Sequence, residues 1–285
     1  MTLLLSGLAL GSVYALVAIG YNLVFISSHS FNFAQAQLMM VGAFVAFAGY
    51  VTFDLPVVVI IALAALVVAV LSSIEERIAV RPVKDTHTQL ITTLGFGTIL
   101  TGAVTIIWGT QPRAVPFVTS NEVITILGGR VYPAEIALIV FAVALVVLIL
   151  LYFRRFLGGL ALVAMSQDTE AAALRGVNVR KLAFLTFAVT GALSGVMGVF
   201  LGPKTFAFAA LGASLALKGF VALAVGGFGS FTGGLIGGFA VGLVETFSAR
   251  YLGTSYALLS VFALLMIVLM LRPEGLFGKI PERAV

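Results

Sequence analysis

The chain has 285 residues, of which 61% are hydrophobic and only 9% are Asp, Glu, Lys or Arg. A soluble domain carries about 25% charged residues, so the composition excludes an ordinary soluble protein and predicts a membrane protein. The net charge of +5 does not indicate nucleic-acid binding, because the loop charges of a membrane protein explain it. No cysteine and only two histidines are present, which excludes thiol chemistry and argues against a zinc site.

Apolar runs follow one another along the whole chain. Because a helix needs roughly 20 apolar residues to cross the bilayer, we predict spans at residues 3–26, 35–53, 55–74, 89–109, 133–152, 182–202, 215–229, 231–249 and 252–271. The run at 215–229 is short and ends in glycines. The pattern predicts one domain over 1–285, an all-α polytopic membrane protein with about eight to nine transmembrane helices, one of them short or broken. A Gly-Gly turn between β-prone residues at 123–132 predicts a small hairpin in an external loop, 110–132.

The basic residues are distributed unevenly between the predicted loops. Three clusters hold eleven of them: Arg77, Arg81 and Lys84; Arg154, Arg155, Arg175, Arg180 and Lys181; and Arg272, Lys279 and Arg283. Only Arg113, Arg130, Lys204 and Arg250 fall on the opposite side, while Lys218 falls inside a span. Basic loops stay in the cytoplasm, so we predict an external N-terminus and a cytoplasmic C-terminus. This parity requires the short run at 215–229 to cross the membrane, although a re-entrant segment remains an alternative.

The cytoplasmic loop 153–181 contains a short predicted helix. Ser166 can cap its start, the first-turn acidic residues suit the helix dipole, and Gly176 can adopt the left-handed conformation that ends it. A helix this short is marginal alone and needs a surface to dock against. The same residues fit equally well a connector helix that lies in the membrane interface and docks on no partner. The candidate docking residues are Ser166, Asp168, Thr169, Glu170, Leu174, Arg175 and Gly176.

Two polar or glycine-rich interruptions are candidates for a translocation path. Polar groups at membrane depth are tolerated where they line a watery path or are buried in protein, and a broken helix is the best sequence pointer to a transport site. The competing interpretation of the first interruption is an ordinary inner turn. Glycines repeated at intervals of four, Gly191/Gly195, Gly198/Gly202, Gly229/Gly233/Gly237 and Gly234/Gly238/Gly242, are mostly interpreted as helix packing. The candidates are Asn22, Asn32, Phe33, Gln35 and Gln37 in the first, and Gly226, Gly227, Gly229 and Ser230 in the second.

Lys218 and Glu245 are charged residues inside predicted adjacent spans. Intramembrane charges are functional hypotheses by default, so an ion pair between them is one prediction. Snorkelling of both side chains to the interface is the alternative.

Several short motifs, taken in order, resemble the inner-membrane permeases of branched-chain amino acid ABC importers (LivH type). The motifs are Gly7-Leu8-Ala9-Leu10-Gly11-Ser12-Val13-Tyr14-Ala15-Leu16, Phe31-Asn32-Phe33-Ala34, Arg81-Pro82, Gly176-Val177-Asn178, Lys218-Gly219-Phe220, Gly226-Gly227-Phe228-Gly229-Ser230 and Arg272-Pro273-Glu274-Gly275-Leu276-Phe277-Gly278. The resemblance implies alternating access in a bacterial inner membrane, and a second homologous permease, two cytoplasmic ATP-binding subunits and a periplasmic solute-binding protein as partners. The helix 166–176 then resembles the coupling helix that docks on the ATPase. No Walker loop is present, so the chain itself is expected to need no cofactor, with ATP bound by its partners.

The chain departs from the family where Asn-Phe-Ala is commonly followed by His-Gly-Glu, because it has Gln35-Ala36-Gln37 there. Relatives also carry urea, short amides and aromatic acids, so the sequence does not fix the substrate. An ion-coupled secondary transporter of small organic solutes is the alternative function. That mechanism usually needs a midplane relay, for which Glu245 is the candidate. An enzyme is not expected, because we find no cluster of nucleophiles, acids or metal ligands.

Overall fold

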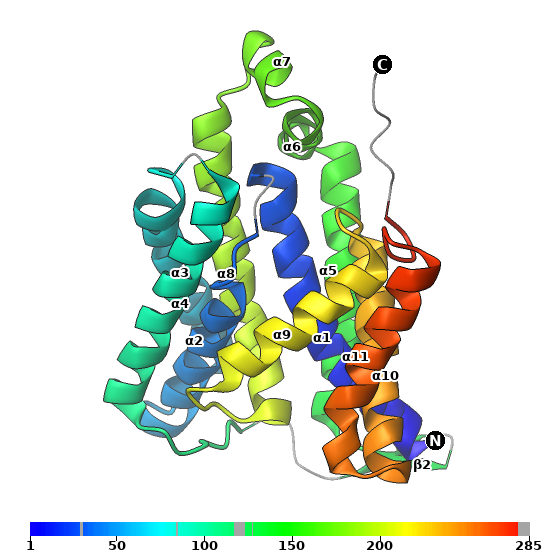
Figure 1. Ribbon diagram of the computed structural model, residues 1–285. Coiled ribbons are helices and arrows are strands. Elements are labelled where there is room, and N and C mark those ends of the chain that lie inside the picture. The colour runs from blue at the N-terminus through cyan, green and yellow to red at the C-terminus, as the bar shows by residue number, and fades with distance from the viewer. Residues whose placement is uncertain (29–30, 84, 117–122, 127, 279–285) are drawn as a thin grey trace. The chain divides into compact units, whose positions relative to one another are not determined.

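The structure is a computed structural model that describes residues 1–28, 31–83, 85–116, 123–126 and 128–278. Of the residues singled out above, Lys84, Lys279, Arg283 and parts of the loop 110–132 lie outside this set. The helices are α1 (Thr2–Ser28), α2 (Gln35–Phe47), α3 (Val57–Glu75), α4 (Thr86–Trp108), α5 (Pro133–Arg155), α6 (Leu157–Gln167), α7 (Thr169–Leu174), α8 (Val179–Thr205), α9 (Leu211–Gly226), α10 (Phe231–Tyr251) and α11 (Thr254–Leu271). Figure 1 shows their arrangement.

Eight helices within the described residues are long and apolar enough to span a membrane: α1, α2, α3, α4, α5, α8, α10 and α11. Two of them, α2 and α3, continue into π-helical turns at Ala48–Thr52 and Glu76–Val80. Helix α9 has 16 residues, which rise about 24 Å and fall short of the roughly 30 Å hydrocarbon core. The predicted fold class, with one short helix, is therefore confirmed.

The predicted hairpin is also present. Strands β1 (Ile124–Ile126) and β2 (Gly129–Val131) pair antiparallel, with Ile124 opposite Val131. Gly128 between them has a φ of 76°, which suits a tight turn. Its external location stays a prediction.

The chain divides into two compact units, each drawn from separate stretches of sequence. The first unit contains Met1–Asn22, Asn121–Val146 and Leu217–Val285, and the second contains Leu23–Ser120 and Val147–Ala216. Helices α1, α5 and α9 each contribute to both. The single domain over 1–285 stays a prediction.

Small residues set the helix spacing inside each unit. In the second unit, a Cβ atom on Gly195 of α8 would collide with the carbonyl oxygen of Ala64 on α3. In the first unit, a Cβ on Gly238 of α10 would lie 2.5 Å from the backbone nitrogen of Ala15 on α1. These glycines therefore allow backbones to touch, which confirms the packing interpretation of the glycine repeats.

Helix α4 begins at a side-chain cap outside the apolar segments. The carboxylate of exposed Asp85 accepts hydrogen bonds of 2.9 Å from the backbone N–H and the hydroxyl of Thr88. These bonds stabilise the ionised form and lower the pKa of Asp85 from its usual value. The cap fixes the start of a predicted span.

Candidate functional site

The glycine-rich turn after α9 is held by one buried amide in the first unit. Asn22, which is fully buried, donates from Nδ2 to the carbonyl oxygen of Ser230 at 3.0 Å. Its Oδ1 accepts from the backbone N–H of Gly229 at 2.8 Å. Ser230 in turn caps α10, because its hydroxyl accepts from the N–H of Gly233 at 3.0 Å. The structure thus brings together Asn22, Gly229 and Ser230, three of the predicted path residues from distant parts of the sequence.

The C-terminal segment completes the end of α9. The N–H of Leu276 donates to the carbonyl of Val225 at 2.9 Å, and that of Phe277 donates to the carbonyl of Gly226 at 3.0 Å. The last carbonyls of a helix have no partner within the helix, and unpaired carbonyls are costly in a membrane. Gly227, with a φ of 103°, turns the chain directly after these carbonyls. The turn therefore depends on residues 276–277 as well as on its own glycines.

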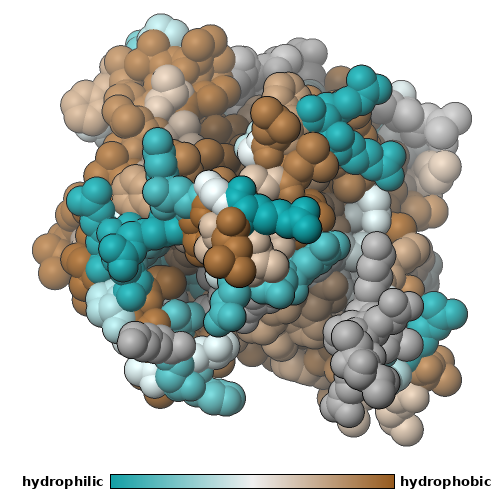
Figure 2. Space-filling model, turned by 90° about the horizontal axis from the view of Figure 1, so that it is seen from above, coloured by the Kyte–Doolittle hydropathy of each residue, from teal (hydrophilic) through white to brown (hydrophobic). Residues whose placement is uncertain are grey.

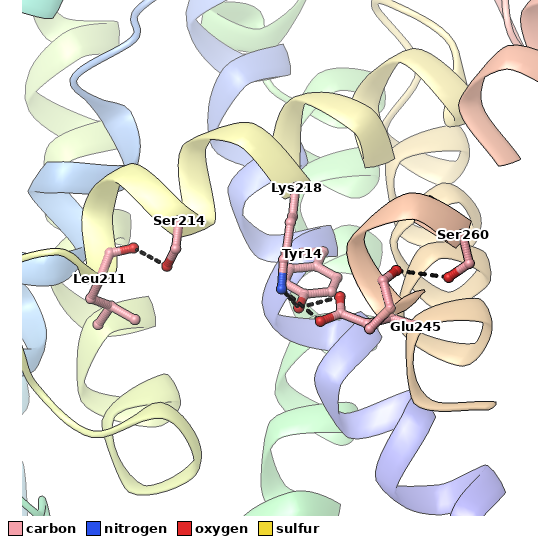
Figure 3. A network of polar contacts seen from close by, with 7 residues as sticks. Tyr14, Leu211, Ser214, Lys218, Glu245 and Ser260 are labelled. Carbon is pink, nitrogen blue, oxygen red and sulfur yellow. Dashed lines mark hydrogen bonds and ion pairs between the residues drawn. The ribbon is translucent and has the colours of Figure 1, made fainter. Parts of the chain in front are cut away.

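Lys218 and Glu245 form the predicted ion pair (Figure 3). The Nζ atom of Lys218 on α9 lies 2.6 Å from Oε1 of Glu245 on α10. Tyr14 on α1 joins them, because its hydroxyl donates to Oε2 of Glu245 at 2.7 Å and accepts from Lys218 at 3.2 Å. The Lys218 and Glu245 side chains are only 22% and 13% exposed, so pairing rather than snorkelling describes them. The hydrogen-bonded side chains of Tyr14, Lys218 and Glu245 thus connect three helices of the first unit.

The other candidate path residues lie in the second unit. Asn32 is buried, and its Nδ2 donates to Oε2 of Glu75 on α3 at 3.0 Å. The amide nitrogen of Gln35, at the start of α2, donates to the hydroxyl of Ser194 on α8. The backbone N–H of Phe33 donates to the hydroxyl of Thr93 on α4 at 3.3 Å. The polar interruption is therefore anchored to three helices.

Gln37 occupies a narrow place between two glycines of the second unit. A Cβ atom on Gly97 would lie 3.1 Å from the Gln37 Cδ, and one on Gly212 would lie 2.9 Å from the Gln37 Cα. Four buried side-chain oxygens in this region have no hydrogen-bond partner among the described residues: Oε1 of Gln35, Oε1 of Gln37, Oε1 of Glu75 and Oγ1 of Thr190. Buried acceptors of this kind are rare in folded proteins, and they mark this polar cluster as a candidate site.

The loop 153–181, which is predicted to be cytoplasmic, contains two helices, which corrects the predicted single helix. Ser166 does not cap a helix, because it lies in the last turn of α6 and its hydroxyl donates to the carbonyl of Val163 at 2.8 Å. Asp168 is the cap of α7, and its carboxylate accepts from the N–H groups of Glu170 and Ala171 at 2.9 Å each. The sequence offered two capping side chains close together, and the apolar run before Ser166 extends α6 past the first one.

The end of the second helix agrees with the prediction. Gly176 has a φ of 90°, and its N–H donates to the carbonyl of Ala173. The N–H of Val177 donates to the carbonyl of Ala172, which completes a Schellman-type ending. Helix α7, with six residues, is therefore held rigidly at both ends. Its Leu174 side chain is 90% exposed, and the neighbouring Thr169, Glu170 and Arg175 are exposed as well.

Comparison with known proteins identifies the family. Residues 3–271 match the family model described as "Branched-chain amino acid transport system / permease component". The chain belongs to this family. It is 30% identical to the Pseudomonas aeruginosa high-affinity branched-chain amino acid transport system permease protein BraD, over 98% of this chain and 95% of BraD. It is 31% identical to the corresponding permease protein LivH of Salmonella typhimurium, over 97% of this chain and 94% of LivH.

A solved structure supports the fold of this permease component. PsaBC from Streptococcus pneumoniae in complex with Fab aligns with a TM-score of 0.51, covering 96% of this chain and 93% of that chain. The sequence identity is 15%, so this likeness concerns the fold alone. Together the comparisons confirm the predicted family, the polytopic helical class and the transport function.

Sequence reasoning missed several polar residues of the permease. Glu75 was assigned to the basic loop, yet it is fully buried at the end of α3 against Asn32. Tyr14 was noted only as part of a motif, and Ser194 only fell inside a predicted span. A polar residue one turn from the end of a long apolar run was the available signal for Glu75. The partners themselves are far apart in sequence and could not be paired from it.

Proposed function

We propose that this chain is the transmembrane permease subunit of an ATP-driven ABC importer, which carries branched-chain amino acids or related small polar solutes by alternating access. The observation that carries the proposal is the family match across residues 3–271, supported by relatives named as branched-chain amino acid permeases over nearly the whole chain. The chain performs no catalysis and binds no cofactor. Two ATP-binding subunits, a second homologous permease and a periplasmic binding protein complete the transporter.

In this proposal the permease lies in a bacterial inner membrane with its N-terminus outside and its C-terminus in the cytoplasm. The distribution of basic residues supports this orientation. In the second unit, Arg77 and Arg81 both lie over the ring of Phe184 near the start of α8, at 5.0 and 5.8 Å from its centroid. Arg154 and Arg155 end α5, and Arg175 ends α7. These cations therefore gather at one end of the second unit, as expected for a cytoplasmic end.

Helix α7 is the proposed coupling element toward the ATPase. Its rigid ends and exposed Leu174 fit a short helix that inserts an apolar side chain into a groove of a partner. Movement of the ATPase subunits would then be transmitted through α6 and α8, which flank α7 in the chain. The polar groups around Asn22 in the first unit and around Asn32, Phe33, Gln35 and Gln37 in the second are proposed to face the path when it opens.

Reconstitution of the complete transporter tests the function. The chain is co-purified with the proposed ATPase, permease and binding-protein partners, and uptake of radiolabelled leucine into proteoliposomes is measured. We expect uptake that requires ATP and the binding protein, and that persists when ionophores collapse the proton and sodium gradients. Uptake by the chain alone, driven by an ion gradient, would instead support an ion-coupled carrier.

A substitution in α7 tests the coupling role in the same system. Leu174→Asp should abolish stimulation of ATP hydrolysis by substrate-loaded binding protein while leaving the permease folded. Leu252→Asp is the matched control, because Leu252 is also exposed, at 65%, but lies in the turn between α10 and α11. Equal ATPase stimulation in the Leu174 variant and the wild type would contradict the assignment of α7.

A further inference from the structure

Helix α6 follows a predicted membrane span but runs in a different direction. Figure 1 shows α6 nearly end-on, whereas α8 of the same unit runs along the length of the bundle. The α5 span ends at Arg155, and α6 begins two residues later at Leu157. A short apolar helix that turns aside where a span ends is positioned to lie in the membrane interface.

Aromatic side chains at the junction of α5 and α6 support this placement. The rings of Tyr152 and Phe156 stack with centroids 5.6 Å apart, and Phe153 meets Tyr152 edge-on at 5.9 Å. Tyr152 and Phe156 are exposed. Exposed aromatic residues beside basic ones are typical of the level of the lipid headgroups. Figure 2, which looks onto this end of the molecule, shows hydrophilic and hydrophobic surface side by side.

An open groove of about 320 Å³ lies between α6 and the first turns of α8. Leu162 and Met165 of α6 pack against Ala172, and the groove residues Val177 and Leu182 pack against the same cluster, so the groove borders this small core. The groove is lined by Leu157, Gly158, Ala161, Val177, Asn178, Lys181, Leu182 and Leu185. Six of these eight residues are apolar or glycine, and they lie on both walls of the groove. The other two, Asn178 and Lys181, are polar.

Along α8, the polar lining residues come before two of the apolar ones. Asn178 and Lys181 lie at the start of α8, while Leu182 and Leu185 follow toward the interior of the span. Residues 178 and 185 are about 10 Å apart along the helix axis. The single charge among the lining residues is the ammonium of Lys181, and Arg180 is exposed beside it. The groove thus presents a cation toward the aqueous side and an apolar surface toward the bilayer.

We infer that this groove binds an anionic phospholipid, with the phosphate at Lys181 and one acyl chain along Leu182 and Leu185. Apolar contact alone would accept any lipid, whereas the cation at the headgroup end favours a net negative headgroup. Basic pockets beside membrane helices are known to select such headgroups. The site lies within the second unit alone, and the inference does not depend on the transported solute.

Native mass spectrometry of the purified full chain in detergent tests the site. We expect one dioleoyl phosphatidylglycerol to bind about fivefold more tightly than dioleoyl phosphatidylcholine, the effect of one nearby cation. Lys181→Gln should remove this preference, and Lys181→Arg should retain it. The matched control is Arg250→Gln, which removes an exposed cation at the end of α10 and should leave the preference intact.

A fluorescence measurement keeps the inference testable if the Lys181 variants fail to fold. Because the chain has no cysteine, a single Leu185→Cys can be labelled with bimane in an otherwise unchanged protein. Brominated phosphatidylglycerol in nanodiscs should quench this label more strongly than brominated phosphatidylcholine at the same mole fraction. Ala161→Phe, which fills the groove, should weaken the quenching by both.

Several outcomes would overturn the inference. Equal binding of the two lipids, or an equal effect of Arg250→Gln and Lys181→Gln, would mean that bulk charge rather than the groove selects lipid. Competition by millimolar inorganic phosphate would assign the cation to a free anion. Loss of quenching when the ATPase subunits are added would assign the groove to a protein partner.

Discussion

Nζ of Lys218 and Oε1 of Glu245 lie 2.6 Å apart, although the two residues are 27 positions apart in the chain. The pair connects the short helix α9 to α10, and Tyr14 adds α1 through the same carboxylate. Little of either charged side chain is exposed. An ion pair in such surroundings contributes little net stability, but leaving one charge without its partner is expensive.

We therefore predict strong non-additivity at this pair. Lys218→Met and Glu245→Gln should each destabilise the permease when made alone. The loss for Lys218→Met should be about 3 kcal/mol, because this variant leaves the Glu245 carboxylate without its cation. The double variant should recover much of this loss, since neither charge remains. Unfolding in mixed detergent micelles measures the four members of the cycle. Additive losses would show that the two residues do not act as a pair.

Asn22 is predicted to be indispensable for the turn after α9. Asn22→Ala removes both the donor to Ser230 and the acceptor from Gly229. The Ser230 carbonyl keeps its bond from the Gly234 N–H, but the Gly229 N–H is left unpaired at a cost of about 1–3 kcal/mol. Asn22→Asp keeps the acceptor for the Gly229 N–H, so its loss of stability should be smaller than that of Asn22→Ala. Thermal unfolding and uptake are measured together. If Asn22→Ala unfolds and transports like the wild type, the two hydrogen bonds of Asn22 to the turn have no role.

The interaction of residues 276–277 with α9 can be separated from side-chain packing. Phe277→Pro removes the backbone N–H that donates to the Gly226 carbonyl, whereas Phe277→Ala keeps that donor and removes only the ring. We expect the proline variant to be less stable by about 1–3 kcal/mol beyond the alanine variant. Thermal midpoints of the two purified proteins measure the difference. Identical midpoints would show that the hydrogen bond is dispensable.

The contrast between Gly176 and Ser166 shows which helix ends could be predicted from the sequence and which could not. Gly176 was assigned correctly, because a helix ending depends on one residue and its immediate neighbours. Ser166 was assigned wrongly, because it and Asp168 are both good capping residues, and the packing of Leu162 and Met165 of α6 against Ala172 favours a helix that continues past Ser166. Capping chemistry limits where a helix can begin or end, and tertiary packing decides between the remaining positions.

Apart from the Lys218–Glu245 pair, the long-range partners could not be predicted from the sequence. Asn32 and Glu75 are 43 positions apart, and Gln35 and Ser194 are 159 apart. The apolar runs predicted every helix that spans, since span length and composition are local properties. They carried no information on which face of each helix meets which neighbour. The path residues were found as polar interruptions, and their individual partners required the structure.

The polar cluster of the second unit predicts a selective transport defect. Gln37→Ala removes an amide from a tight site beside Gly97, and the loss of a side chain there should be tolerated by the fold. If this residue helps to line the path, leucine uptake should fall severalfold without loss of assembly. Gln89→Ala is the control, because Gln89 lies on α4 and bonds the carbonyl of Val83 near the helix start. Unchanged uptake in the Gln37 variant would refute a pathway role.

Gly176 and Gly95 form a matched pair for testing the end of α7. A Cβ atom at either position would meet nothing within 4 Å, but only Gly176 has a positive φ, of 90°. Gly176→Ala should therefore lower stability by about 1–2 kcal/mol through backbone strain. Gly95→Ala lies within helix α4 and should instead raise stability slightly, by up to about 1 kcal/mol. If α7 couples to the ATPase, Gly176→Ala should also reduce the stimulation of ATP hydrolysis strongly, although it lowers the stability of the whole protein only slightly. The reason is that the strain is relieved by unwinding this short helix first. Equal behaviour of the two variants in unfolding and ATPase assays would show that the left-handed ending is not required.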